Sequence, residues 1–433
     1  IMKKTLFVLS WLLSLTIAIL YTYENPETFD MLKYKIKEYR SKTHTIKNPI
    51  IPETELEKGP VQKVIANSFN VEFSKIISMS ESFANTIRTA FIVHDEDILN
   101  FDENSLKIYT QNGFLLKNFK SERLNLPKTF LSVEKNGGVK TIFIYNDHEF
   151  ALISSKKHEC FYASIVLLSK GKEIFKTKCL PTDNLDFNGL GSSNIHHKNQ
   201  IFLIISIPTR DSYEVHDLAQ DKNSVFGKIV EINKNDLDKI IANEENNLDV
   251  KIFTMGHRTA QGLTKINESF FSVEHGPKGG DELNKIIKGK NYGWPKVSYG
   301  TKYMWNEKGK SFEISHENNE FEEPLFALVP SVGISAVNSC PKKLKTYYKK
   351  PCLLALSLYG NQLRSGRSLI IYLLNEKMDK VHSVEKIHLR ADLRLRHFVT
   401  NSKNELYEDK EGNIYVSADK KGIYKLSFIN FRN

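Results

Sequence analysis

The sequence Gly256-His257-Arg258-Thr259-Ala260-Gln261-Gly262-Leu263 opens a stretch that concentrates polar chemistry in loops. It is followed by His275-Gly276-Pro277-Lys278-Gly279-Gly280-Asp281-Glu282-Leu283-Asn284 and then by Asn291-Tyr292-Gly293-Trp294-Pro295. Together these segments hold a guanidinium, an amide, imidazoles, two adjacent carboxylates and several glycines. Such a set suits a site that binds an anionic, oxygen-rich ligand together with a hard cation. The paired glycines predict a turn that needs positive φ angles.

Short runs of branched and aromatic residues extend on both sides of this stretch. Examples are 141–145 (TIFIY), 201–205 (IFLII), 227–232 (GKIVEI) and 413–417 (NIYVS). Asn, Asp, Gly and Lys turns separate them, which is the pattern of an all-β protein. A turn, a strand, a second tight turn and a second strand recur weakly along the chain, as in the blades of a β-propeller. An array of β-sandwiches is the alternative.

Composition limits the classes of partner. The chain has 433 residues, 40% of them hydrophobic, which is ample for a folded core. Its net charge of +10 comes mostly from lysines scattered along the whole length. We interpret this charge as a solvated surface and expect no nucleic-acid partner, because no dense basic block or nucleic-acid motif occurs. An anionic membrane surface or an acidic partner remains open.

The N-terminal segment has the features of a targeting element. Lys3 and Lys4 precede an uncharged run at 5–23, close to the roughly 20 residues that a membrane-spanning helix needs. We expect a signal anchor or a signal peptide at 1–23 and a helical linker at 24–50. The body at 51–433 would then lie in the periplasm or elsewhere outside the cytoplasm, held at the membrane by residues 5–23.

The four cysteines fall into two local pairs. We predict the disulfides Cys160–Cys179 and Cys340–Cys352, which suit an oxidising compartment. Four unrelated thiols in the core are the alternative, since sequence alone does not determine connectivity. A zinc site is not expected, because no Cys-x-x-Cys spacing occurs.

The central stretch resembles the signature of the soluble pyrroloquinoline quinone (PQQ)-dependent aldose sugar dehydrogenases, the glucose/sorbosone dehydrogenase family. That signature reads roughly GHRNPQGL, EHGPQGGDELN and NYGWPxVSYG. Fragments in the same order extend the resemblance over about 188–426: Ala219-Gln220-Asp221 resembles the family's AQD segment, and Arg394-Leu395-Arg396 resembles its RIRDV strand. The resemblance implies a six-bladed β-propeller with its active site in loops at the channel mouth. Little aligns at 51–187.

The resemblance also implies the binding residues. PQQ carries three carboxylates, and Arg258, Arg394 and Arg396 are the cations that would neutralise them. Thr259, Gln261 and His275 match further cofactor positions, although hydrogen bonding within the scaffold is an alternative role for His275. The carbonyls of Gly276 and Pro277 would hold a Ca²⁺ ion, and Glu282 and the Tyr292 backbone would hold a second one.

The two distal arginines have an alternative reading. Arg394 and Arg396 lie two positions apart on an expected strand and therefore share a face. Salt bridges to Asp281 or Glu282 would satisfy them without any ligand. If the resemblance holds, these arginines instead converge with Arg258 and the peptide oxygens of Gly276 and Pro277 around one bowl at the centre of the ring.

The implied reaction oxidises the anomeric carbon of an aldose to a lactone and passes electrons to an external acceptor. The family's catalytic histidine lies in an HFGS-like motif, and the local match here, Gly189-Leu190-Gly191-Ser192-Ser193, has Gly189 in its place. His196 and His197 follow closely but are expected at the outer end of a strand.

Other departures affect the pocket. Thr259, Ala260 and Leu328 replace the family's asparagine, proline and tryptophan. The alternative function is therefore a catalytically degenerate, membrane-tethered propeller that serves as a binding module.

Overall fold

The computed structural model describes residues 54–56, 59–79, 86–92, 106–133, 137–181, 187, 190–208, 213–302, 312, 315–359, 367–389 and 393–432. The expected signal anchor at 1–23 and linker at 24–50 lie outside these residues, as does Gly189. Within the described ranges, no helix combines the length and the apolar character that a membrane crossing requires.

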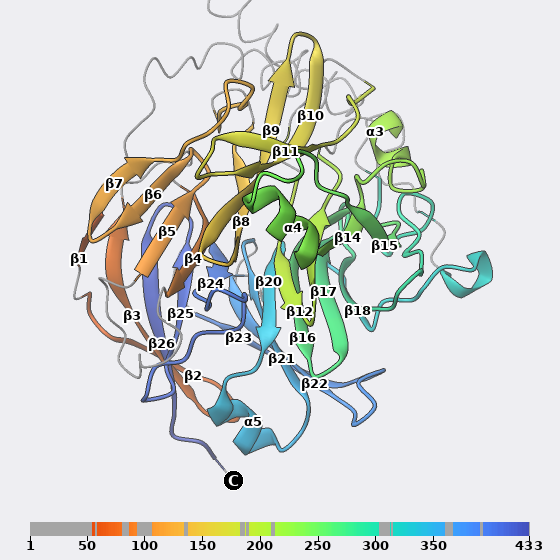
Figure 1. Cartoon of the computed structure of the whole chain (residues 1–433). Coiled ribbons are helices and arrows are strands. Elements are labelled where there is room, and N and C mark those ends of the chain that lie inside the picture. The colour runs from red at the N-terminus through yellow and green to blue at the C-terminus, as the bar shows by residue number, and fades with distance from the viewer. Residues whose placement is uncertain are drawn as a thin grey trace, which may run out of the picture. The chain divides into compact units, whose positions relative to one another are not determined.

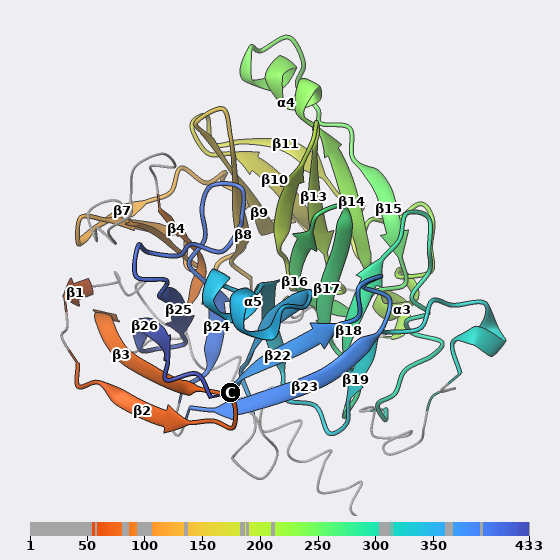
Figure 2. The ribbon, with the colours of Figure 1, turned by 90° about the horizontal axis from the view of Figure 1, so that it is seen from below.

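The predicted all-β, six-bladed propeller is confirmed: six antiparallel sheets surround one axis (Figures 1 and 2). The first three blades are built from consecutive strands. Blade 1 contains β4 (Ile87–Ile92), β5 (Leu106–Thr110), β6 (Phe114–Lys117) and β7 (Lys120–Arg123). Blade 2 contains β8 (Val139–Tyr145), β9 (His148–Lys157), β10 (Cys160–Leu167) and β11 (Lys172–Lys176). Blade 3 contains β12 (Asn194–His197), β13 (Gln200–Ile205), β14 (Lys228–Asn233) and β15 (Lys251–Met255).

The fourth and fifth blades follow the same plan, with the first strand of each innermost. Blade 4 contains β16 (Thr259–Ile266), β17 (Ser269–His275), β18 (Asp281–Ile286) and β19 (Phe326–Leu328). Blade 5 contains β20 (Ile334–Ser339), β21 (Cys352–Ser357), β22 (Ser368–Leu374) and β23 (Val381–His388). The described helical elements are short and lie in connections: α3 (Tyr213–Asp217), α4 (Lys234–Ile241), η5 (Glu317–Asn319) and α5 (Lys342–Tyr348).

Blade 6 joins the two ends of the described chain. Its inner strands come from the C-terminal part, as β24 (Leu395–Phe398), β25 (Ile414–Ala418) and β26 (Gly422–Ile429). The next strand outward is β3 (Asn70–Met79), whose outer edge pairs with both β1 (Thr54–Leu56) and β2 (Gln62–Ile65). Figure 2 shows the N-terminal strands beside the C-terminal ones in this sheet. Hydrogen bonds between β3 and β26 therefore close the ring.

Apolar side chains fill the spaces between neighbouring blades. Phe150 and Leu203, which are fully buried, belong to one cluster shared by blades 2 and 3. Phe271 and Leu353 are fully buried in a cluster shared by blades 4 and 5. This burial explains why the predicted strands are so rich in branched and aromatic residues.

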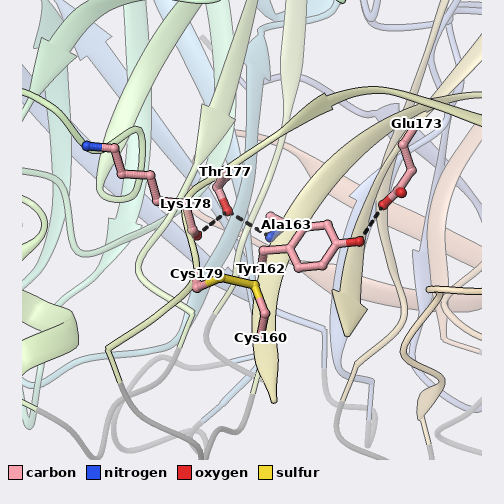
Figure 3. Close-up of a disulfide and its surroundings, with 7 residues drawn as sticks. All are labelled: Cys160, Tyr162, Ala163, Glu173, Thr177, Lys178 and Cys179. Atoms are coloured by element: carbon pink, nitrogen blue, oxygen red, sulfur yellow. Dashed lines mark hydrogen bonds between the residues drawn. A yellow bond between two sulfur atoms is a disulfide. The ribbon is translucent and has the colours of Figure 1, made fainter. Parts of the chain in front are cut away.

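Both predicted disulfides are confirmed. Cys160 on β10 pairs with Cys179, with 5.1 Å between their Cα atoms, and fastens the segment after β11 to its blade (Figure 3). Cys340 pairs with Cys352 across the connection that contains α5, with a Cα–Cα distance of 5.4 Å. No described cysteine is free.

Candidate functional site

The six inner strands enclose a narrow channel. A cavity of about 30 Å³ within it is lined by residues of every inner strand or its approach, among them Arg88, Ser192, Gln261 and His397. The first residue of each inner strand lies at the same end of its blade as the loop between the second and third strands. In blade 4, for example, Thr259 at the start of β16 pairs with His275 at the end of β17. We call this end of the channel the loop mouth.

Arg258 connects two of the loops at this mouth. It lies just before β16, and its Nη1 donates hydrogen bonds to the carbonyl oxygens of His275 at 3.1 Å and Gly276 at 2.9 Å. Its guanidinium carbon lies 5.2 Å from the centre of the Trp294 ring. Only 8% of Arg258 is exposed. The structure therefore brings this arginine and the Gly276 carbonyl together, as the resemblance implies.

Asp281 anchors the glycine-rich loop at 276–280 by accepting a hydrogen bond from a backbone amide of that loop. Its Oδ1 accepts from the Gly276 amide at 3.2 Å, and its Oδ2 accepts from the amides of Val332 and Ile334 at 2.9 and 3.1 Å. The carboxylate thus holds the loop against the start of blade 5. Asp281 is a scaffold residue rather than a partner of Arg394 or Arg396.

Glu282 lies in a buried acidic group with Glu274 and Asn284. The Asn284 amide nitrogen donates to Glu274 at 2.7 Å and to Glu282 at 3.2 Å. Burial, followed by repulsion from Glu274, raises the pKa of Glu282 well above its ordinary value. Among the described residues, no group of three or more His, Cys, Asp or Glu side chains forms a metal cluster.

Arg394 and Arg396 share a carboxylate that the sequence did not indicate. Arg394 Nε lies 3.2 Å from Asp419 Oδ2, and Arg396 Nε donates to Asp419 Oδ1 at 2.6 Å. The alternative of salt bridges to Asp281 or Glu282 is therefore wrong. Asp419 lies in the turn between β25 and β26, where the chain passes beside the start of β24.

A third arginine joins this group from blade 1. Arg88 donates from Nη2 and Nε to Gln111 Oε1 at 2.6 and 3.2 Å. Burial opposes ionisation of Asp419, but Arg396, Arg394 and Arg88 together hold its pKa below the ordinary value. We call Arg88, Arg394, Arg396 and Asp419 the Asp419 cluster. Three cations around one carboxylate leave this cluster with a net positive charge.

His275 is a buried imidazole that is influenced by arginines of two blades. Burial lowers its pKa; Asp281 opposes this effect, while Arg258 and Arg396 reinforce it. Both guanidinium groups therefore lie within electrostatic range of one imidazole. Arg258 of blade 4 and Arg396 of blade 6 thus both influence His275, while the convergence of all three predicted arginines around one bowl stays a prediction.

Tyr292 and Trp294 act through the scaffold. The Tyr292 hydroxyl donates to the carbonyl of Lys285 at 2.5 Å, and its ring stacks on His257 with centres 4.6 Å apart. Trp294 Nε1 donates to His216 Nδ1 at 2.9 Å. His257 and Trp294 thus contribute packing and hydrogen bonds to the scaffold.

Gln261 and Thr259 lie near the top of the channel. Gln261 lines the cavity. Gly191 packs directly against it, and no larger residue would fit at position 191, because a Cβ there would lie 2.6 Å from Gln261 Nε2 and 2.3 Å from the Ala260 carbonyl oxygen. The Thr259 hydroxyl lies 3.5 Å from Arg258 Nη1. Leu328, by contrast, is buried in the blade 4 cluster and pairs with Asp281, so its position is not a stacking surface.

His196 and His197 lie at the β12–β13 turn, away from the loop mouth. Burial, together with Lys234, Lys403 and Lys265, lowers the pKa of His196 to about 3. His197 Nε2 lies 3.1 Å from Glu268 on the surface. Neither imidazole joins the cations of the loop mouth.

His397 is a residue that the sequence analysis missed. It follows Arg396 on β24 and lines the channel cavity. A signal for it existed, because the RIRDV-like strand carries this histidine where the family pattern has aspartate.

Comparison with known proteins gives the family. The model of the glucose/sorbosone dehydrogenase family matches residues 164–424. The chain belongs to this family. The match begins within β10 and includes every residue proposed to bind the cofactor or metal.

Individual relatives match over shorter stretches. The aldose sugar dehydrogenase YliI of Escherichia coli is 32% identical over 129 residues, 28% of this chain and 33% of that protein. Quinoprotein glucose dehydrogenase B of Acinetobacter calcoaceticus is 39% identical over 84 residues, 18% of this chain and 17% of that protein. An uncharacterised protein of Synechocystis is 41% identical over 99 residues, 22% of this chain and 24% of that protein. The matches thus span at most a third of these relatives.

A solved structure shares the fold over nearly its whole length. The soluble aldose sugar dehydrogenase of Escherichia coli, in its apo form, superposes with a TM-score of 0.58 at 20% identity, covering 85% of this chain and 99% of that one. The likeness extends over residues N-terminal to the family match. It supports the conclusion that blades 1 and 2 complete the same propeller.

Proposed function

We propose that this protein oxidises the anomeric carbon of an aldose to a lactone, using PQQ and Ca²⁺ and passing electrons to an external acceptor. Family membership supports the reaction class. The single observation that carries the proposal is that Arg258, bound to the Gly276 carbonyl, and Arg396, bound to Asp419, both act on the buried His275 at the loop mouth. An excess of fixed cations in a partly buried site suits a ligand with several carboxylates.

The described residues fit the cofactor. Arg394, Arg396 and Arg258 would bind its carboxylates, with Gln261, Thr259 and His275 as further polar contacts. When bound, PQQ supplies the acceptor for the two electrons and the hydrogen that leave the sugar carbon. The arginines would orient that acceptor and would stabilise negative charge on it.

The calcium part of the proposal relies on backbone oxygens. The Gly276 carbonyl already accepts from Arg258, but a carbonyl oxygen has two lone pairs and can serve a second partner. With Pro277 it would provide ligands of the type that Ca²⁺ prefers. Glu282 and the Tyr292 carbonyl would hold a second ion, and a nearby cation would relieve the repulsion between Glu274 and Glu282.

The second candidate is a propeller that has lost catalysis and binds a partner at the same mouth. Gly189, in place of the family's histidine, favours it. On this reading the excess positive charge would still attract an anionic ligand, but no turnover would follow.

The setting of the reaction is also a proposal. Two disulfides favour a compartment outside the cytoplasm, such as the periplasm. Residues 5–23 would tether the propeller to the membrane.

The test uses purified full-length protein loaded with PQQ and Ca²⁺. Calorimetric titration of PQQ measures binding, and aldose-dependent reduction of a redox dye across a broad sugar panel measures turnover. Binding with turnover supports the dehydrogenase. Binding without turnover supports the degenerate propeller, and absence of both would refute the assignment of the loop mouth.

A further inference from the structure

His397 is placed and oriented by the inner strand of blade 6. Its backbone amide donates to Ser417 Oγ at 3.1 Å, which fixes β24 against β25 at this point. The side chain lines the same cavity as Arg88, Ser192 and Gln261. Its Nε2 is buried and makes no hydrogen bond with the described residues. A buried polar atom without a partner is costly, and this one belongs to a side chain that lines the channel, so a molecule bound in the channel could satisfy it.

The charges around His397 keep its ring neutral. Burial comes first, and Arg396 on the same strand and Arg88 on β4 add to it; only Asp419, in the β25–β26 turn, opposes them. Together they lower the pKa of His397 to about 3. At neutral pH the ring therefore has one nitrogen with no hydrogen, which can accept a proton.

We propose that His397 is the general base of this enzyme and replaces the histidine that is missing at Gly189. The inference rests on the proposed function. It is favoured over a purely structural role because the His397 side chain lines the channel together with Arg88, whereas His196 and His197 lie at the β12–β13 turn, away from the loop mouth.

The step balances as follows. The proton of the anomeric hydroxyl moves to the ring nitrogen of His397, and the oxygen's electron pair forms the C=O bond of the lactone. The hydrogen on C1 leaves with its two electrons for the quinone that the proposed function supplies. His397 then releases its proton to solvent through the channel, and the external acceptor reoxidises the cofactor.

Cofactor binding should make His397 a stronger base. Burial is the main cause of the low pKa of His397 and would persist, but the carboxylates of PQQ would offset the contributions of Arg396 and Arg88, so this pKa should rise when the cofactor binds. A base is most effective when its pKa approaches the working pH. The site would therefore be poorly basic when empty and competent when loaded.

The first experiment reads out protonation instead of activity. Protein with isotopically labelled histidine is titrated by NMR between pH 5 and pH 8, without and with PQQ and Ca²⁺, and His397→Asn identifies the resonance. We expect the His397 signal to be constant without PQQ and to begin to titrate at the acidic end of this range with PQQ bound, because only the contribution of the arginines is offset. A signal that is the same in both states would overturn the proposal.

The second experiment separates catalysis from binding. His397→Asn and His397→Gln are compared with His196→Asn, a matched control, since His196 is also buried, neutral and without a partner at Nε2. We expect kcat to fall about 10²- to 10⁴-fold in both His397 variants, while PQQ affinity is unchanged. The control should retain activity.

The outcomes are distinguishable. If the wild-type protein neither binds PQQ nor turns over sugar, the proposed function fails. If the wild type is active and both His397 variants match it, only the base assignment fails. Loss of PQQ binding in both variants would show that His397 positions the cofactor and would also overturn the assignment.

Discussion

Arg396 is a side chain at the loop mouth that pairs with Asp419 in this structure and could also bind a carboxylate of a ligand. In this structure its two nitrogens bind Asp419, and its charge also lowers the pKa of His275 and His397. A bound carboxylate would compete for the same guanidinium. The pair with Asp419 therefore holds the arginine ready without consuming all of its donors.

Replacing Arg396 with glutamine should weaken cofactor binding. A hydrogen bond to a charged group contributes about 1.5–3 kcal/mol, so PQQ affinity should fall roughly 10- to 150-fold in a calorimetric titration. Arg123→Gln is the control, because Arg123 is exposed on the outer strand β7. Equal affinities for the two variants would remove Arg396 from the site.

Asp419→Asn should change the acid sensitivity of the fold. A carboxyl whose folded pKa is lowered contributes stability above its unfolded pKa of about 3.9, and that contribution is lost as the pH falls through the folded value. The variant should be about 3 kcal/mol less stable than wild type at pH 7 in urea unfolding, since it leaves buried cations unpaired. The difference should shrink below pH 4. Asp249→Asn, at an exposed position, should show no effect at either pH.

Sequence reasoning located Arg258, Arg394 and Arg396 but not their partners. The reason is physical: Asp419 and Arg88 reach the cluster only because blades 6 and 1 are neighbours in the closed ring. Arg88 belongs to the part of the chain where no resemblance was visible. The spacing of residues within a strand predicts which side chains share a face. It does not predict which residues of a neighbouring blade lie opposite that face.

At the scale of elements, the candidate site is formed mainly by short connections between strands, whereas the strands form the framework of the sheets. The predicted strands at 141–145 and 201–205 fall within β8 and β13, because period-two patterning and branched residues report burial in a sheet directly. The loops before β12 and β16 are different. Their conformation depends on contacts between them, such as Gly191 against Gln261, which a single segment does not reveal.

Gly191→Ala tests this loop contact. The added methyl group would displace the Ala260 carbonyl or the Gln261 amide, so we expect both lower stability and weaker PQQ binding. Gly289→Ala is the comparison: it has a φ of +79° and open space around its Cα, so it should cost about 1 kcal/mol in backbone strain alone. If PQQ affinity falls in neither variant, the contact between Gly191 and Gln261 is not needed for cofactor binding.

At the scale of the whole molecule, stability depends on the seam between β3 and β26. Phe73 is 2% exposed, belongs to the core of blades 5 and 6 and pairs with Leu426 across the seam. Its replacement by alanine should cost about 3–5 kcal/mol in urea unfolding, with loss of a single cooperative transition if the ring opens. Ile65→Ala on β2, where the side chain is 70% exposed, should change stability by less than about 0.5 kcal/mol. Similar losses in both variants would contradict the assigned role of the seam.

The pairing of β3 with β26 also means that the ring cannot close until the end of the chain has been synthesised. β3 emerges from the ribosome early, whereas its partner β26 is among the last segments made. At about 5–20 residues per second, an apolar strand edge waits for tens of seconds before it can be covered. A truncation near residue 420 would remove β26 and would leave this edge of β3 without its partner strand.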